Sequence, residues 1–196
     1  MKEATLSRKT NETDINLTLK LDGAGQSKIN SGSGFFDHML TLFAKHGLFD
    51  IELSCKGDVD VDYHHSVEDI GIVLGAAFSE ALGDGRGIRR YGNCTLPMDE
   101  ALVDVALDIS GRAYLNCDLS IPSPTVGNFD TELVEEFLLA FCRSLKLTLH
   151  VRQLAGKNAH HIIEAVFKGL GRALRKAVEQ DERLMGQLPS TKGLLL

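Results

Sequence analysis

The first half of the chain uses two apolar spacings, one typical of strands and one typical of helices. Residues 15–21 place Ile or Leu at every second position, which predicts a strand with one buried face. Helical spacing over 35–46, followed by Gly47, predicts a helix and its end. A strand follows at 49–55, and a second helix then carries apolar side chains every three or four residues as far as Gly83.

The second half of the chain repeats this order. Its apolar positions predict strands at 102–109 and 112–119, a helix at 130–145, a strand at 147–152 and a helix that continues to Leu174. Each half therefore contains strands, a helix, a strand and a helix. The predicted fold is an α+β two-layer sandwich, with helices on one face of a sheet and an internal duplication.

Glycines mark the joint between the two halves. Three of them fall within Gly83 to Gly87, and such a run is typical of a connection rather than of a helix or strand. We therefore predict a first structural repeat at residues 1–88 and a second at 89–196. The second repeat would end in a C-terminal tail, and the two repeats would form one compact catalytic unit.

A histidine motif is also repeated. A pair of histidines followed by a glutamate occurs twice, as His64, His65 and Glu68 and as His160, His161 and Glu164. Seven histidines in 196 residues would give about a quarter of one such pair by chance. Both pairs begin a predicted helix, and Asn158 is a candidate N-cap of the second. One such pair alone is usually a polar first turn, so the duplication is what predicts a shared chemical role.

The helical spacing directs these side chains to two points on each helix. Residues i and i+4 share a helix face, so His64 and Glu68 can converge while His65 is rotated by about 100°. The same holds for the second motif. Imidazole and carboxylate ligands without thiolates suit Mn²⁺, Fe²⁺ or Zn²⁺, and high coordination numbers favour Mn²⁺. The motifs therefore predict metal binding.

The duplication predicts two further ligands on the preceding helices. His38 lies upstream of the first motif, and alignment of Phe43 with Phe141 puts Glu136 opposite it. Glu136 taken alone would be a solvated helix residue, because Glu132 and Glu135 lie beside it. His46 and His150 have no duplicated counterpart, and we interpret both as structural.

Composition narrows the function classes. Acidic residues number 27 and basic residues 21, which gives a net charge of −6 and argues against binding to nucleic acid or anionic membranes. No apolar run approaches the roughly 20 residues of a membrane span. The four cysteines have no paired metal spacing and no secretory segment precedes them, so we expect reduced thiols and a cytoplasmic location.

At this point the chain resembles the imidazoleglycerol-phosphate dehydratase family. The segments that carry the resemblance run in order through Gly34 to Leu40, Asp62 to Asp69, Arg89 to Gly92, Pro97 to Ala101, Gly127 to Glu132, Ala155 to Ala165 and Pro189 to Gly193. The resemblance implies a fold like the second domain of ribosomal protein S5, duplicated. It also implies a homo-oligomeric shell of 24 subunits with active sites between subunits.

The resemblance implies two Mn²⁺ ions per active site. One would be held by His64, Glu136, His160 and Glu164, and the other by His38, His65, Glu68 and His161. Many family members have His where this chain has Glu136, and a carboxylate can also bind Mn²⁺.

The activity implied is loss of water from D-erythro-imidazole-glycerol phosphate to give imidazole-acetol phosphate, in histidine biosynthesis. The hydrogen that is removed lies on a carbon of the substrate side chain and is not acidic. Metal at both ring nitrogens would stabilise an imidazolate and make the ring an electron sink.

The reaction also needs an acid/base group and a phosphate site. Glu12 matches the acid/base glutamate of the family, and Asp99 is a second candidate for proton transfer. The residues at substrate-binding positions are Glu12, Arg90, Arg112, Lys168, Ser190, Thr191 and Lys192. Two other hypotheses are a two-metal phosphatase or hydrolase, and a metal-organised shell without catalysis.

Overall fold

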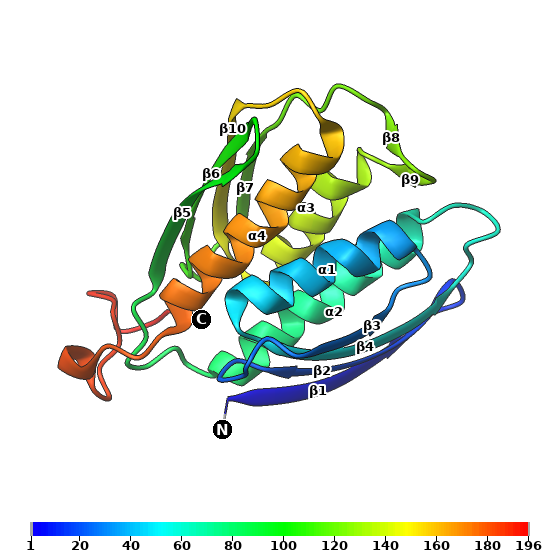
Figure 1. The fold of residues 1–196 in the computed structure, drawn as a ribbon. Coiled ribbons are helices and arrows are strands. Elements are labelled where there is room, and N and C mark those ends of the chain that lie inside the picture. The colour runs from blue at the N-terminus through cyan, green and yellow to red at the C-terminus, as the bar shows by residue number, and fades with distance from the viewer. Residues whose placement is uncertain (1, 196) are drawn as a thin grey trace.

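Two sheets form the outside of the molecule and four helices lie between them (Figure 1). The structure is a computed structural model that describes residues 2–195. The elements of the first half are β1 (Glu3–Lys9), β2 (Thr13–Lys20), β3 (Ser27–Asn30), α1 (Gly34–Gly47), β4 (Asp50–Gly57) and α2 (His64–Leu82). Their strands form a four-stranded sheet in the order β1-β2-β4-β3.

The second half has the same topology. Its elements are β5 (Tyr91–Met98), β6 (Ala101–Asp108), β7 (Tyr114–Asp118), β8 (Thr125–Val126), β9 (Phe129–Asp130), α3 (Leu133–Leu145), β10 (Thr148–Ala155), α4 (Ala159–Val178) and a short 3₁₀ helix at Glu182–Leu184. The sheet order β5-β6-β10-β7 matches that of the first half. In both sheets only the last pair of strands is parallel. The predicted duplicated α+β fold is confirmed.

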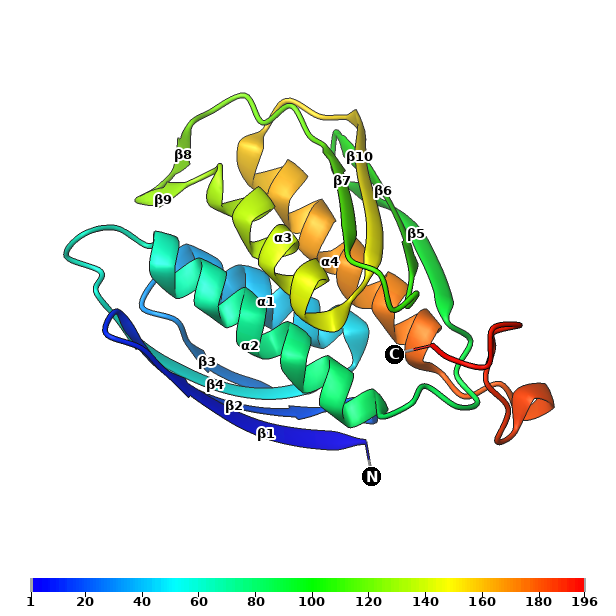
Figure 2. The same ribbon diagram turned by 180° about the vertical axis from the view of Figure 1, so that it is seen from behind.

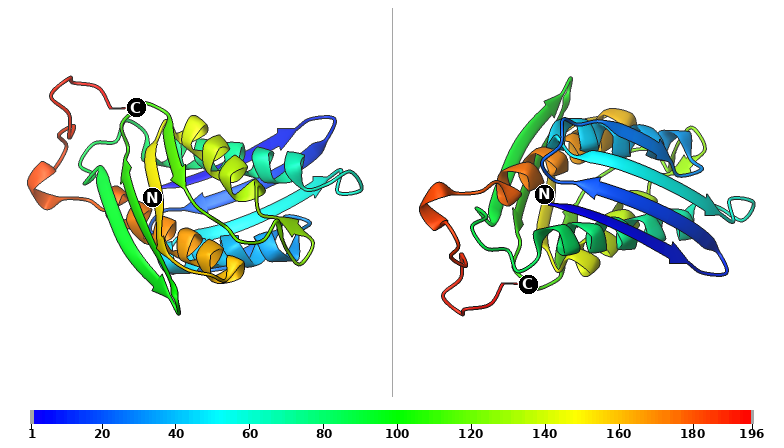
Figure 3. Two further views of the ribbon diagram at one scale, coloured as in Figure 1. Left: turned by 90° about the horizontal axis from the view of Figure 1, so that it is seen from above. Right: turned by 90° about the horizontal axis from the view of Figure 1, so that it is seen from below.

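Each half is a two-layer unit, and the two units pack through their helices. Helix α2 lies against α3 and α1 lies against α4, as Figure 3 shows from above and below. Alternating positions of β2, such as Leu17 and Leu19, are fully buried against the helices, while Asn16 is exposed. We propose that the boundary between the repeats lies at residues 88 and 89, between α2 and β5.

A cluster of phenylalanines fills the space between the helices. Its fully buried members include Phe36, Phe43, Phe49, Phe78, Phe137, Phe141 and Phe167. The rings of Phe49 and Phe78 meet edge to face, with centroids 5.0 Å apart and planes at 89°. Burial of each such side chain contributes about 1.5–3 kcal/mol, so this cluster is a main source of the fold's stability.

Two predicted helix boundaries are wrong. Helix α1 includes Gly47, and the left-handed residue that ends it is Leu48, with φ of 54°. Gly47 has a different role, because a Cβ there would collide with the ring of Phe49. Helix α3 begins at Leu133 rather than at Asp130, because Phe129 and Asp130 pair with β8 in a short hairpin.

Small residues let α2 approach α3 closely. A Cβ added at Gly75 would lie 2.7 Å from the backbone oxygen of Phe141 and 2.8 Å from the Cβ of Ser144. A Cβ at Gly71 would lie 2.9 Å from the backbone oxygen of Phe137. The backbone of the neighbouring helix therefore requires glycine at both positions.

We expect Gly75→Ala to lower the free energy of unfolding by about 1–3 kcal/mol, because the added methyl group must push α3 away. This loss outweighs the gain in helix propensity of about 1 kcal/mol. The measurement is the midpoint of urea unfolding. Gly34→Ala is the matched control, since a Cβ there meets no atom within 4 Å. Equal midpoints for the two variants would contradict the prediction.

The topology gathers the helix starts on one side of the molecule. The N-terminal ends of α1, α2, α3 and α4 all face the side where the β8–β9 hairpin lies, while the C-terminal tail lies at the other end (Figures 1 and 2). All eight predicted metal ligands occupy the first two turns of these helices. Among the described residues, no helix is both long and apolar enough to cross a bilayer.

Candidate metal centre

Packing of α1 on α4 brings three predicted ligands together. His38 Nε2 lies 2.8 Å from Glu164 Oε1, and His160 Nε2 lies 3.1 Å from the same oxygen. One ligand atom from each residue lies within 4.8 Å of the other two. Within residues 2–195, no other group of three such side chains converges this closely.

Glu164 is the buried centre of this group. Its relative exposure is 6%, whereas His38 is exposed and His160 half-buried. The second oxygen, Oε2, accepts a hydrogen bond of 2.5 Å from Lys168 Nζ. Burial alone would raise the pKa of Glu164, but hydrogen bonds from Lys168, His38 and His160 outweigh it and lower that pKa to about 2. The carboxylate is therefore ionised.

The second histidine of the first motif lies between two carboxylates. His65 Nδ1 donates to Asp58 Oδ2 at 2.9 Å, and His65 Nε2 lies 3.7 Å from Glu12 Oε1. The hydrogen bond to Asp58 raises the pKa of His65, with a smaller contribution from Glu12. Glu12 lies in the turn between β1 and β2, and its backbone oxygen accepts a hydrogen bond from Asp58 N.

The second histidine of the other motif has an equivalent environment. His161 Nδ1 donates to Glu100 Oε2 at 2.7 Å, and His161 Nε2 lies 3.8 Å from Asp99 Oδ2. Asp99 and Glu100 form the turn between β5 and β6, which corresponds to the β1–β2 turn of the first half. Hydrogen bonds from His161 and from two backbone N–H groups lower the pKa of Glu100 to about 2. The predicted N-cap Asn158 is confirmed, since its side chain accepts from His161 N.

The sequence interpretation missed Asp58 and Glu100. Glu100 stands beside the candidate Asp99, and Asp58 directly follows a strand, but the two come from different kinds of loop. Asp58 precedes α2, whereas Glu100 comes from a hairpin of the sheet. Alignment of the two halves therefore does not pair Asp58 with Glu100. Only the structure shows that each carboxylate contacts the Nδ1 atom of a histidine.

The remaining predicted ligands lie apart in a single copy of the chain. His64, Glu68 and Glu136 are half-buried in the first turns of α2 and α3. The resemblance assigned His38 and Glu164 to different metals, yet here they share a hydrogen bond. The two sets of four ligands stay a prediction, because one copy of the chain assembles neither set completely within the described residues.

The predicted phosphate-binding residues fall into two places. Lys168 lies beside the proposed metal ligands, where its ammonium group forms a salt bridge with Glu164. Arg90 lies beside the C-terminal tail, where it donates to the backbone oxygen of Pro189. It also donates two hydrogen bonds to the Asp108 carboxylate, at 2.7 and 3.0 Å. Arg112 donates to the backbone oxygen of Ser110. Ser190, Thr191 and Lys192 belong to the tail, where Ser190 Oγ accepts from Lys192 N.

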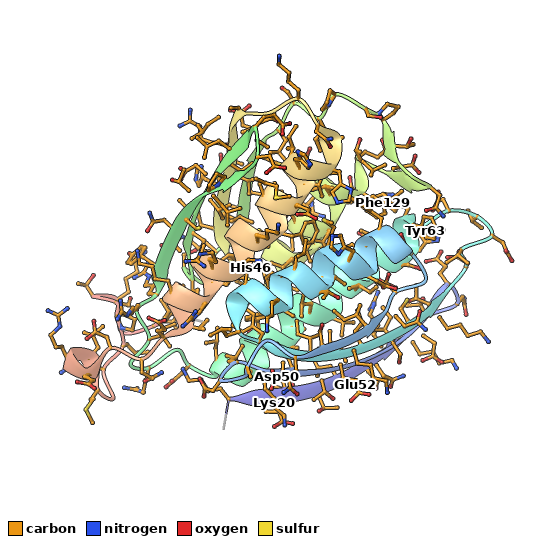
Figure 4. The ribbon with its side chains drawn as sticks, viewed as in Figure 1. Lys20, His46, Asp50, Glu52, Tyr63 and Phe129 are labelled. Atoms are coloured by element: carbon orange, nitrogen blue, oxygen red, sulfur yellow. The ribbon has the colours of Figure 1, made fainter. Side chains whose placement is uncertain are left out.

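Three further side chains mark the two ends of helix α1. Tyr63 and Phe129 lie at the start of α1, while His46 lies near its far end (Figure 4). The Tyr63 hydroxyl accepts from Asn128 at 2.7 Å, and Phe129 packs on Phe35. Burial, then Lys168 and Arg172, lowers the pKa of His46, so this histidine is held neutral.

The arrangement combines metal ligands with proton-transfer groups. Two imidazole nitrogens and one carboxylate oxygen form the donor set that Mn²⁺, Fe²⁺ and Zn²⁺ accept. The exposed carboxylates of Glu12 and Asp99 lie near the imidazoles of His65 and His161, where each can accept or release a proton. Such a site can bind a nitrogen heterocycle through a metal and move protons beside it.

Comparison with known proteins identifies what this chain is similar to. Residues 31–174 match the family model described as imidazoleglycerol-phosphate dehydratase. The imidazoleglycerol-phosphate dehydratase of Thermoanaerobacter pseudethanolicus is 58% identical over 195 residues, covering 100% of both chains. That of Desulforamulus reducens is 57% identical over 194 residues, covering 99% of this chain and 98% of that one.

Solved structures agree with the sequence comparison. The crystal structure of imidazoleglycerol-phosphate dehydratase from Staphylococcus aureus has a TM-score of 0.83 and 42% identity, covering 91% of this chain and 99% of that chain. The enzyme from Pyrococcus furiosus also has a TM-score of 0.83 and 42% identity, covering 97% and 100% of the two chains.

Proposed function

Since this chain belongs to the imidazoleglycerol-phosphate dehydratase family, we propose that it is a hydro-lyase that dehydrates D-erythro-imidazole-glycerol phosphate. The product is imidazole-acetol phosphate, and the reaction is a step of histidine biosynthesis. The observation that carries the proposal is the convergence of His38, His160 and Glu164 at the helix starts. A substrate with an imidazole ring is itself a nitrogen ligand, so a metal at this point could hold it.

We propose Mn²⁺ as the metal, with two ions per active site. The ionised, buried carboxylate of Glu164 and the two adjacent imidazole nitrogens fit this ion. The eight proposed ligands are His38, His64, His65, Glu68, Glu136, His160, His161 and Glu164. A metal held by these residues would stabilise the imidazole of the substrate as an imidazolate, whose electrons help to expel the hydroxyl on the carbon attached to the ring.

Glu12 is proposed to remove the hydrogen from the second side-chain carbon of the substrate, counted from the ring. Its exposed carboxylate is held near His65 and so near the proposed metal end of the site. The hydroxyl on the carbon attached to the ring leaves with a proton as water, and the proton on the next carbon passes to the Glu12 carboxylate. The resulting enol takes up a proton at carbon and becomes the ketone, so one water is lost overall. Asp99, in the equivalent hairpin turn, is the candidate for the second proton transfer.

Substrate phosphate is proposed to bind the cationic residues on family positions. Lys168 would contribute beside the metal, and Arg90, Arg112, Ser190, Thr191 and Lys192 would contribute from the opposite end of another copy. In one chain the tail and the helix starts lie at opposite ends (Figure 1). This separation supports active sites that lie between subunits. We therefore propose a homo-oligomer, and from the resemblance a shell of 24 subunits.

The test is product formation from imidazole-glycerol phosphate by metal-stripped protein, with and without Mn²⁺. We expect imidazole-acetol phosphate only when Mn²⁺ is present, because the bound metal would act as the electron sink. Full turnover by metal-free protein would contradict the proposal. Release of inorganic phosphate instead of ketone would favour a two-metal phosphatase, and metal-dependent assembly without turnover would favour a non-catalytic shell.

A further inference from the structure

Two carboxylates that are not themselves proposed metal ligands form hydrogen bonds with histidines that are. Glu100 Oε2 is 2.7 Å from His161 Nδ1, and Asp58 Oδ2 is 2.9 Å from His65 Nδ1. In both cases the other ring nitrogen, Nε2, is directed toward a hairpin-turn carboxylate at 3.7–3.8 Å. The two halves reach this arrangement through different loops, so it is not a by-product of copied sequence.

An ionised carboxylate can accept a hydrogen bond but cannot donate one. The proton of a neutral His161 must therefore lie on Nδ1, which leaves the lone pair on Nε2. A metal binds the unprotonated nitrogen, and the hydrogen bond at the other nitrogen fixes both the tautomer and the orientation of the ring. Glu100 thus leaves Nε2 of His161 unprotonated, so that this nitrogen can bind a metal.

Glu100 itself is fixed by a second set of contacts. Its other oxygen, Oε1, accepts from the backbone N–H groups of Lys157 at 3.1 Å and Asn158 at 2.8 Å. These residues immediately precede α4, which carries His160, His161 and Glu164. One side chain therefore ties the β5–β6 turn both to the start of α4 and to the ring of His161.

We propose that Glu100 is a positioning residue that selects the Nδ1–H tautomer of His161 and so presents Nε2 to metal. Asp58 has the same role for His65. This inference rests on the proposed function of the site as a metal centre. It makes a separate claim about the metal-free protein, because the tautomer is set before any metal binds.

Glu100→Gln tests the proposal with almost no change in shape. The amide oxygen is expected to stay with the two backbone N–H groups, since the opposite orientation would leave both without an acceptor. The amide NH₂ then faces His161 Nδ1 and can only donate to it. The proton of His161 must move to Nε2, where it blocks the metal. Asp104→Asn in the same hairpin removes the same charge and is the control, since Thr95 Oγ1 can still donate to the amide oxygen.

The first measurement is the tautomer of His161 by ¹⁵N-histidine NMR in the metal-free assembly, at a pH well above the ordinary histidine pKa. We expect an Nδ1–H tautomer in the unmodified protein and in Asp104→Asn, and an Nε2–H tautomer in Glu100→Gln. A spectrum in which His161 is the same mixture in all three proteins would overturn the proposal. This reading does not depend on folding yield or turnover, so a structural defect alone does not imitate it.

The second measurement is Mn²⁺ affinity by electron paramagnetic resonance of the free ion. We expect affinity to fall about tenfold to a hundredfold in Glu100→Gln and to be unchanged in Asp104→Asn. A changed tautomer with unchanged affinity would overturn the positioning role. If the unmodified protein binds no Mn²⁺ although its His161 tautomer is as expected, the proposed metal centre fails while the assigned tautomer stands, so the two failures are distinguishable.

Discussion

Glu164→Gln is expected to reduce Mn²⁺ affinity and dehydratase turnover by roughly 100-fold or more, because removal of even a supporting group at a metal site costs about 10–100-fold. Glu164 is the buried anion on which both His38 and His160 converge. Glutamine is neutral and cannot accept from both imidazoles while it also faces the Lys168 ammonium. The measurements are metal content per chain and the rate of ketone formation.

Two further variants separate metal loss from unfolding. Lys168 is 15% exposed and loses its partner in Glu164→Gln, which leaves a partly buried charge and lowers stability. Adding Lys168→Met should restore the urea midpoint without restoring metal binding. Glu179→Gln, just beyond the end of the same helix, should leave metal content unchanged. Full metal content in Glu164→Gln would show that this residue is not a ligand.

Glu12→Gln is expected to lower kcat by about 10²–10⁴-fold while metal content stays unchanged, since an acid/base group contributes a factor of that size. The carboxylate lies 3.7 Å from His65 Nε2 in a turn whose backbone is fixed by Thr10 and Asp58. The amide has the same size but cannot accept a proton. The measurement is kcat as a function of pH, with metal content determined in parallel.

A control from the same hairpin strengthens this test. Asp14 is on β2 and pairs with Lys9 at the surface, so Asp14→Asn removes the same charge close to Glu12 and should keep kcat within about twofold, as expected for a surface substitution. An unchanged kcat in Glu12→Gln would exclude Glu12 as the proton-transfer group.

Some strands were missed from the apolar pattern for a physical reason. Strand β1 is an edge strand with one neighbour, and its polar side chains Thr5 and Ser7 are exposed. Strand β3 has only four residues and contains a single apolar side chain, Ile29. Short edge strands need little burial because backbone pairing to one neighbour holds them, so a periodic apolar pattern is not required there.

The local sequence by itself determined the repeat and the start of α4, and it supplied the residue types of the proposed ligands. Apolar periodicity depends only on which face of each element is buried, and that is encoded residue by residue. The spacing of His160 and Glu164 fixes their shared face on α4, and Asn158 fixes where that helix begins. These features involve neighbours within one or two helical turns, which is why the amino-acid order was sufficient.

Only the tertiary structure decided which side chains meet. The packing of α1 on α4 places His38 against Glu164, 126 positions further along the chain, and the β5–β6 turn places Glu100 on His161. Such contacts follow from how helices and sheets pack, which spacing along the chain does not encode. For the same reason the sequence pattern did not reveal Asp58 and Glu100, whose common role is defined by position in space rather than by position in the repeat.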